Sequence, residues 1–412
     1  LLERAYRRFA EAPAAPAGPF ERFCDQNADW LDDYALFMAL KEAHSGSWTS
    51  WPRPLALRHL DALDEARQER AEAIEMYRFW QYLFAEQWAA LKAYCHARGV
   101  ALFGDLPIYV AHDSADVWAN PDRFYLDEEG RPTVVAGVPP DYFSETGQRW
   151  GNPIYRWDAM REDDYAWWKR RLAATLNQVD LVRLDHFRAF EAYWEIPAEE
   201  ETAIRGRWVE GPGGHLFDVL RAELGTLPVV AEDLGVITPD VRALMAEQGF
   251  PGMAVLLFAF HGEPDSPFLP HNHLPEQIAY TGTHDNDTIV GWWRDRFSTE
   301  DAEAVEQSRQ FTRAYLDLDA AREADVHWAL IRALLGSVAR TAIIPVQDLL
   351  GLGNEARMNT PGQGHGNWGW RLQPGQLTPE IEHRLRTLTT LYDRVPSEVP
   401  ELAMDVHAEA WS

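Results

Sequence analysis

The sequence predicts an α/β fold in which parallel strands alternate with helices, as in a (β/α)8 TIM barrel. Short apolar runs rich in Val, Ile and Leu recur after residue 99, and segments of helix length separate them. Six such runs favour a barrel over an open doubly wound sheet, which stays an alternative. The runs are ALFGDLPIYV (101–110), VDLVRLDHF (179–187), LPVVAEDLG (227–235), GMAVLLFAF (252–260), QIAYTGTHDND (277–287) and RTAIIPVQDLL (340–350).

The residues before the first run predict helices. WLDDYALFMALKEA (30–43) and EMYRFWQYLFAEQWAALKAYCHARG (75–99) repeat apolar residues at spacings of three and four. We therefore expect a helical insertion subdomain over residues 1–98 and a barrel over residues 99–412. The long interval between the first two strands predicts a lid or loop insertion at about 111–165.

Composition restricts the partners. The formal charge of −27, from 65 acidic and 38 basic residues, argues against nucleic acid and anionic membranes and favours a neutral substrate. No apolar run approaches the roughly 18 residues of a membrane-spanning helix. Only two cysteines, Cys24 and Cys95, are present, without metal-binding spacing, which favours a reducing compartment such as the cytoplasm.

Charged residues gather where the predicted strands end. Active sites of (β/α)8 barrels lie at the C-terminal ends of their strands. A lone carboxylate there is commonly solvated or caps a helix, but the repetition at four strand ends indicates a cleft lined by carboxylates. The strand-end residues are Asp105, Arg183, Asp185, Glu232, Asp233, His284, Asp285 and Asp287.

Carboxylates that converge from several strands suit the cleavage of a glycosidic bond, in which one attacks and another donates a proton. Arg183 and Asp185 are two residues apart and are expected to share a strand face, where a neighbouring guanidinium favours the ionised form of a carboxylate. Asp185 is therefore the predicted nucleophile. Glu232 is the predicted acid, because a less solvated position near negative charge keeps a carboxyl group protonated.

These residues carry a specific resemblance. LFGDLPIYV, VRLDHFRAF, VVAEDLG and TGTHDNDT resemble four short regions of the alpha-amylase superfamily. GVPPDYFSETGQRWGNPIY (137–155) and QDLLGLGNEARMNTPG (347–362) are similar to segments of the amylomaltases, the 4-alpha-glucanotransferases of glycoside hydrolase family 77. The resemblance covers most of residues 20–400 and implies an alpha-amylase-type barrel. Since such a barrel begins with two further strands, we expect these before residue 1.

The resemblance implies a retaining disproportionation without cofactor or metal. A donor alpha-1,4-glucan is cleaved, a glucanosyl unit stays on the enzyme, and another maltodextrin or glucose accepts it. Matched position by position, Asp185 resembles the nucleophile and Glu232 the general acid/base. Asp285 resembles the third carboxylate, which holds the distorted donor sugar with His284 as its partner.

The insertion between the first two strands contains DYFSETGQRWGNP (141–153), which resembles the family's mobile loop over the acceptor sites. Aromatic faces suit the apolar faces of glucose, and carboxylates suit its hydroxyl groups. An ordinary loop whose aromatic residues pack on the barrel is the alternative. The predicted substrate-binding residues are Arg183, His284, Asp105, Asp141, Tyr142, Glu145 and Trp150.

Two other functions stay open. HNH (271–273) and HDND (284–287) contain metal-ligand residue types, as in a metal-dependent TIM-barrel hydrolase, although neighbouring prolines also fit a polar loop. A truncated, non-catalytic glucan-binding protein is the other possibility. The presence of all three carboxylates argues against it.

Overall fold

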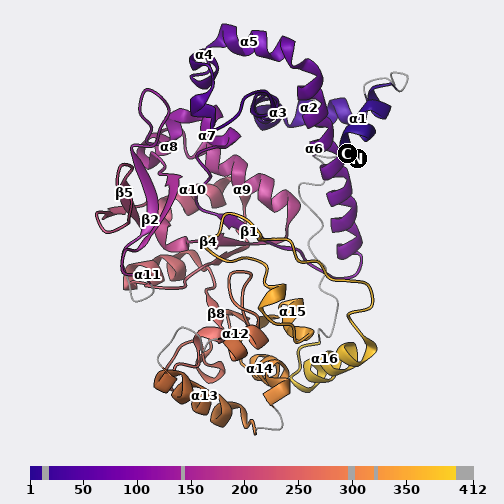
Figure 1. Cartoon of the computed structure of the whole chain (residues 1–412), viewed down its shortest axis with the longest axis vertical. Helices are drawn as coiled ribbons and strands as arrows, with labels where there is room; N and C mark the ends of the chain where they lie inside the picture. Colours follow the sequence, from indigo (N-terminus) through magenta and orange to yellow (C-terminus); the bar gives the residue numbers. More distant parts are fainter. Residues whose placement is uncertain (12–17, 141–143, 296–301, 320–322, 396–412) are drawn as a thin grey trace. The chain divides into compact units, whose positions relative to one another are not determined.

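The computed structural model describes residues 1–11, 18–140, 144–295, 302–319 and 323–395. The chain divides into two compact units: residues up to Gln248 belong to unit 1, and Gly249–Val399 form unit 2. Both are drawn in Figure 1. Among the helices of the described residues, none combines the length and the apolar character that crossing a bilayer requires.

Unit 1 begins with helices. Both predicted helical segments are confirmed, as α3 and as the long α6, and Phe20 of α2 packs with Phe79 of α6 and Tyr6 of α1 in a shared apolar cluster. The α-helices of this unit are α1 (Leu2–Ala10), α2 (Pro19–Gln26), α3 (Ala28–Ala43), α4 (Arg53–Ala56), α5 (Leu60–Glu69), α6 (Ala71–His96), α7 (Ala115–Ala119), α8 (Trp157–Glu162), α9 (Ala166–Gln178), α10 (Gly213–Leu224) and α11 (Pro239–Gln248).

A parallel three-stranded sheet follows these helices in unit 1. It consists of β1 (Phe103–Pro107), β4 (Leu181–Asp185) and β7 (Val229–Ala231), in the order β1-β4-β7. These are the first three predicted strands, and their parallel pairing is confirmed. The register sets Asp105 of β1 opposite Arg183 of β4. Side chains from different parts of the sequence therefore meet at one end of the sheet.

The sequence analysis did not predict a second sheet in unit 1. Four antiparallel strands in the order β3-β2-β5-β6 form it: β2 (Val134–Val138), β3 (Gln148–Pro153), β5 (Ala192–Pro197) and β6 (Arg207–Glu210). Three of the six residues of β3 (QRWGNP) and three of the four residues of β6 (RWVE) are exposed, so these strands need no continuous apolar run. The search for apolar runs could not detect them. Two of the strands, β2 and β3, lie within the predicted insertion at 111–165.

Unit 2 contains the last three predicted strands, again parallel. They are β8 (Met253–Val255), β9 (Ile278–Tyr280) and β10 (Thr341–Ile343), with β9 in the middle. All three residues of β9 are buried. The helices of this unit are α12 (Ile289–Asp295), α13 (Ala302–Leu316), α14 (Val326–Leu335), α15 (Val346–Leu349) and α16 (Pro379–Leu391). The loop between β9 and α12 carries His284 and Asp285.

Candidate active site

Arg183 joins two of the predicted carboxylates in unit 1. Its side chain is 8% exposed, and its Nε donates to Asp105 Oδ2 at 3.2 Å. One of its Nη groups donates to Asp185 Oδ1. Burial by itself lowers the pKa of Arg183, but the charges of Asp185, Asp105 and Glu232 outweigh burial and raise it. The guanidinium therefore stays cationic and partly neutralises the two carboxylates.

Glu232 directly follows β7 and is held by backbone groups. Its Oε2 accepts a hydrogen bond from the N–H of His186 at 2.8 Å, and its Oε1 accepts one from the N–H of Leu234 at 2.8 Å. Burial, followed by the charge of Asp185, raises the pKa of Glu232 to about 7, although Arg183 and the two backbone hydrogen bonds oppose the shift. At neutral pH this carboxyl group can both donate and accept a proton.

His186, the residue after β4, contacts both Glu232 and the predicted insertion. It follows Asp185 in the left-handed region, with φ of 53°, which turns its N–H toward Glu232. Burial, assisted by the charge of Arg188, lowers the pKa of the His186 ring to about 3, so the ring is neutral. The ring centroids of His186 and of Trp150, on β3, are 4.7 Å apart, and the rings are arranged edge to face. An aromatic side chain of the insertion thus lies beside the residue that follows Asp185.

Three further predicted residues lie in the insertion, namely Asp141, Tyr142 and Glu145. Glu145 lies before β3 and is exposed. Asp141 and Tyr142 lie outside the described residues.

Asp285 is held by a polar network in unit 2. Its Oδ2 lies 3.4 Å from His284 Nε2, and its Oδ1 accepts a hydrogen bond from Asn359 Nδ2 at 2.5 Å. The N–H of Asn359 donates to the carbonyl of His284 at 3.0 Å. The ring of Trp368 lies 5.1 Å from the ring of His284. The predicted pair of Asp285 and His284 therefore lies together, with a polar and an aromatic neighbour.

Arg357 supports the same loop. One Nη donates to the carbonyl of Asp285 at 2.6 Å and the other to Asp287 Oδ1 at 2.5 Å, while Nε donates to the carbonyl of Asn359 at 2.8 Å. The sequence analysis missed Arg357, Asn359 and Trp368 as candidate residues. Arg357 and Asn359 lie in QDLLGLGNEARMNTPG, and the similarity of this segment to the amylomaltases was the signal that could have identified them. Because neither residue lies at the end of a predicted strand, the search of strand ends could not find them.

The predicted residues thus form two groups, one in each unit. Asp105, Arg183, Asp185, Glu232 and Trp150 belong to unit 1, whereas His284 and Asp285 belong to unit 2. Each group places a carboxylate among donors that hold it in one position.

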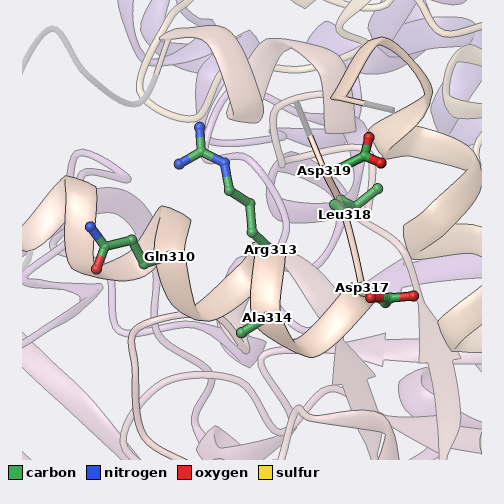
Figure 2. Close-up of a pocket in the computed structure, with 6 residues that line it drawn as sticks. All are labelled: Gln310, Arg313, Ala314, Asp317, Leu318 and Asp319. Carbon is green, nitrogen blue, oxygen red and sulfur yellow. The ribbon is translucent and has the colours of Figure 1, made fainter. Parts of the chain in front are cut away.

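A hollow of about 480 Å³ on unit 2 is separate from these residues, and Figure 2 shows its lining on and after α13. Arg313, which lines it, donates through Nε to Glu323 at 2.8 Å. None of the predicted site residues lines the hollow.

The histidines of HNH bond to protein groups. His271 Nδ1 lies 2.9 Å from the hydroxyl of Tyr315, and His273 Nε2 lies 2.9 Å from the carbonyl of Phe268. In the described part of the chain, no three His, Cys, Asp or Glu residues cluster in a way that could hold a metal ion.

Comparison with known proteins identifies similar enzymes. Residues 1–378 match the family described as 4-alpha-glucanotransferase. A 4-alpha-glucanotransferase from Thermus thermophilus is 52% identical over 401 residues, which cover 96% of this chain and 79% of the relative. A 4-alpha-glucanotransferase from Synechocystis is 47% identical over 96% of this chain and 77% of its own.

Solved structures agree with these matches. The amylomaltase from Streptococcus agalactiae in complex with acarbose superposes with a TM-score of 0.90 at 37% identity, covering 96% of this chain and 78% of that one. The amylomaltase from Corynebacterium glutamicum, at 20% identity and a TM-score of 0.75, shares the fold over 94% of this chain and 58% of its own.

Proposed function

The chain belongs to the 4-alpha-glucanotransferase family, and we propose that it transfers alpha-1,4-glucan segments between maltodextrins by a retaining double displacement. Its fold is the (β/α)8 barrel of alpha-amylase type that the amylomaltases share. The observation that carries the mechanism is the pairing of Asp185 with a buried arginine next to Glu232, whose pKa is raised to about 7. The carboxylate of Asp185, paired with this guanidinium, is the proposed attacking group, and Glu232 can carry the proton.

The proposed reaction has two steps. In the first, a carboxylate oxygen of Asp185 attacks the anomeric carbon, the glycosidic C–O bond breaks, and the proton of Glu232 passes to the leaving oxygen. In the second, Glu232 takes the proton of the acceptor's hydroxyl group, whose oxygen attacks the same carbon and releases Asp185. Two inversions at this carbon retain its configuration. Asp285 and His284 would bind the hydroxyl groups of the donor sugar.

Substrates and location extend the proposal further. We propose that maltodextrins, amylose and fragments of starch or glycogen are donors, and that maltodextrins or glucose are acceptors. The acarbose complex of the Streptococcus agalactiae amylomaltase supports a glucan-binding cleft. The free thiols of Cys24 and Cys95 fit the proposed cytoplasmic location. We further propose that residues 1–98 form a helical subdomain and that residues 99–412 form the catalytic barrel.

Incubation with maltotriose tests the function directly. Disproportionation produces glucose and a ladder of longer maltodextrins, because each transferred segment extends an acceptor. Chromatography of the products distinguishes this outcome from hydrolysis. Accumulation of only glucose and maltose would contradict the proposed transferase.

The pH dependence of the transfer rate should follow the titration of the Glu232 carboxyl group. Because the first step needs its protonated form and its pKa is raised to about 7, kcat is expected to fall about tenfold per pH unit as pH rises above 7. The measurement is the initial rate of glucose release from saturating maltotriose, from about two pH units below that pKa to about two units above it. A rate that stays constant up to pH 9, about two units above the pKa, would contradict the role of Glu232 as the acid.

Trp150→Ala is expected to lower transfer more than hydrolysis. Trp150 lies against His186 and is 39% exposed, so it can stack on an incoming sugar that competes with water for the intermediate. Loss of about 1 kcal/mol of acceptor binding shifts the partition roughly fivefold toward hydrolysis. The measurement is the ratio of transfer products to reducing ends formed from maltotriose.

Trp30→Ala is the matched control. Trp30 of α3 is also 39% exposed, and its Nε1 donates to the nearby Asn27 as that of Trp150 donates to Gln148. This variant should keep the ratio of the unchanged protein. If Trp150→Ala also keeps it, the insertion does not select the acceptor through this side chain.

A further inference from the structure

The loop that carries Asp285 is tied at both ends to a single buried carboxylate. Asp348, on α15, is 1% exposed. Its Oδ2 accepts a hydrogen bond from the hydroxyl of Thr281 at 2.6 Å, directly after β9. Its Oδ1 accepts one from the N–H of Ile289 at 2.8 Å, at the start of α12. One side chain therefore fixes where the loop leaves the sheet and where it enters the helix.

The middle of the loop is tied to the same segment of the chain. Arg357 follows Asp348 by nine residues and donates to the carbonyl of Asp285 and to the carboxylate of Asp287. Asn354, between them, accepts a hydrogen bond from the N–H of Thr288 at 3.3 Å. Residues 348–357 thus form a brace with contacts at the start, the middle and the end of the loop.

We propose that Asp348 and Arg357 are positioning residues for the transfer reaction, which hold the loop so that the carboxylate of Asp285 meets the donor sugar in one fixed place. The inference rests on the proposed role of Asp285. A group that binds a distorted sugar stabilises the transition state only when it is held within a fraction of an ångström of the productive position. The brace provides that restraint through residues that need not touch the sugar.

The presence of a carboxylate at the buried position 348 supports its role in holding both ends of the loop. Burial raises the pKa of Asp348 to about 6, although its hydrogen bonds from Thr281 and Ile289 oppose the shift, so burial of this charge is unfavourable. An apolar residue would fill the space without that penalty. A carboxylate, however, offers two acceptor oxygens, and the two ends of the loop present one donor each.

The test compares Asp348→Ala, Asp348→Asn and Arg357→Gln in the full chain. We expect Asp348→Ala and Arg357→Gln to lower kcat for maltotriose disproportionation by about 10- to 100-fold, with KM changed by less than about threefold. Asp348→Asn should stay within about threefold of the unchanged protein, because an amide can accept from Ile289 and donate to Thr281. Circular dichroism and thermal melting establish that each variant is folded at the assay temperature.

Arg313→Gln is the matched control, since Arg313 is a part-buried arginine of unit 2 that pairs with Glu323 through Nε at 2.8 Å. Its kcat should not change, because Arg313 and Glu323 belong neither to the loop nor to residues 348–357. A purely structural role of the brace would lower the melting temperature of Asp348→Ala and Arg357→Gln and leave kcat of the folded proteins intact. That result would overturn the proposal, and so would an Asp348→Asn variant as slow as Asp348→Ala.

Two further results separate the possible failures. If Asp348→Ala does not fold, the kcat of folded Arg357→Gln alone tests the positioning role: a loss of about 10- to 100-fold supports it, and an unchanged kcat refutes it. Asp285→Asn is measured alongside: a normal kcat in that variant would refute the proposed role of Asp285 itself. A large loss in Asp285→Asn together with a normal kcat in Arg357→Gln would refute only the positioning role.

Discussion

Asp185→Asn is expected to lower the rate of transfer by roughly 10⁴-fold or more while the protein stays folded. An amide has the size of a carboxylate and can still accept the hydrogen bond from Arg183, so the packing at the end of β4 is retained. It cannot form the ester with the anomeric carbon. The measurement is the initial rate with maltotriose, together with thermal melting of both proteins.

A matched variant and a trapping experiment make this result specific. Asp33 pairs with Arg58 at 2.8 Å in the helical part of unit 1, and Asp33→Asn should leave the rate unchanged. In the unchanged protein, a fluorinated donor sugar that slows the second step should label the peptide containing Asp185. A label on another carboxylate would show that the nucleophile has been assigned wrongly.

Glu232→Gln is expected to lower transfer from maltotriose by about 10²- to 10⁴-fold, because the leaving oxygen then departs without a proton. The loss in the first step should be much smaller with maltosyl fluoride, whose leaving group needs no protonation. The second step still lacks its base, so a covalent glucanosyl-enzyme should accumulate and be visible by mass spectrometry. Equal losses in the first step with both donors would contradict the role of Glu232 as acid.

The sequence predicted the parallel strands well because buried parallel strands require continuous apolar runs. It also predicted the grouping of Arg183 with Asp185, since residues two apart share a strand face. The approach of Asp105 to the same arginine follows from the parallel register, which sets Asp105 opposite Arg183. Strand-end residues are therefore the part of this site that local pattern can identify.

The other contacts of the site residues leave no pattern in the local sequence from which they could be predicted. Arg357 and Asn359 reach Asp285 from a loop more than 70 residues later in the chain, and only the folded structure brings them together. The donors to Glu232 are backbone N–H groups, and one of them points correctly because His186 adopts a left-handed conformation that its residue type does not demand. The antiparallel sheet of unit 1 was missed because its edge strands are exposed.

In the proposed mechanism, the charge of Asp185 influences whether Glu232 is protonated at each step. After burial, the charge of Asp185 is the largest influence that raises the pKa of Glu232, while Arg183 and two backbone N–H groups lower it. Formation of the ester in the proposed mechanism removes the charge of Asp185 and leaves Arg183 and the N–H groups in place. The pKa of Glu232 then falls, so the residue is ionised when the acceptor arrives. The covalent bond itself would convert the acid into a base, without any movement of the chain.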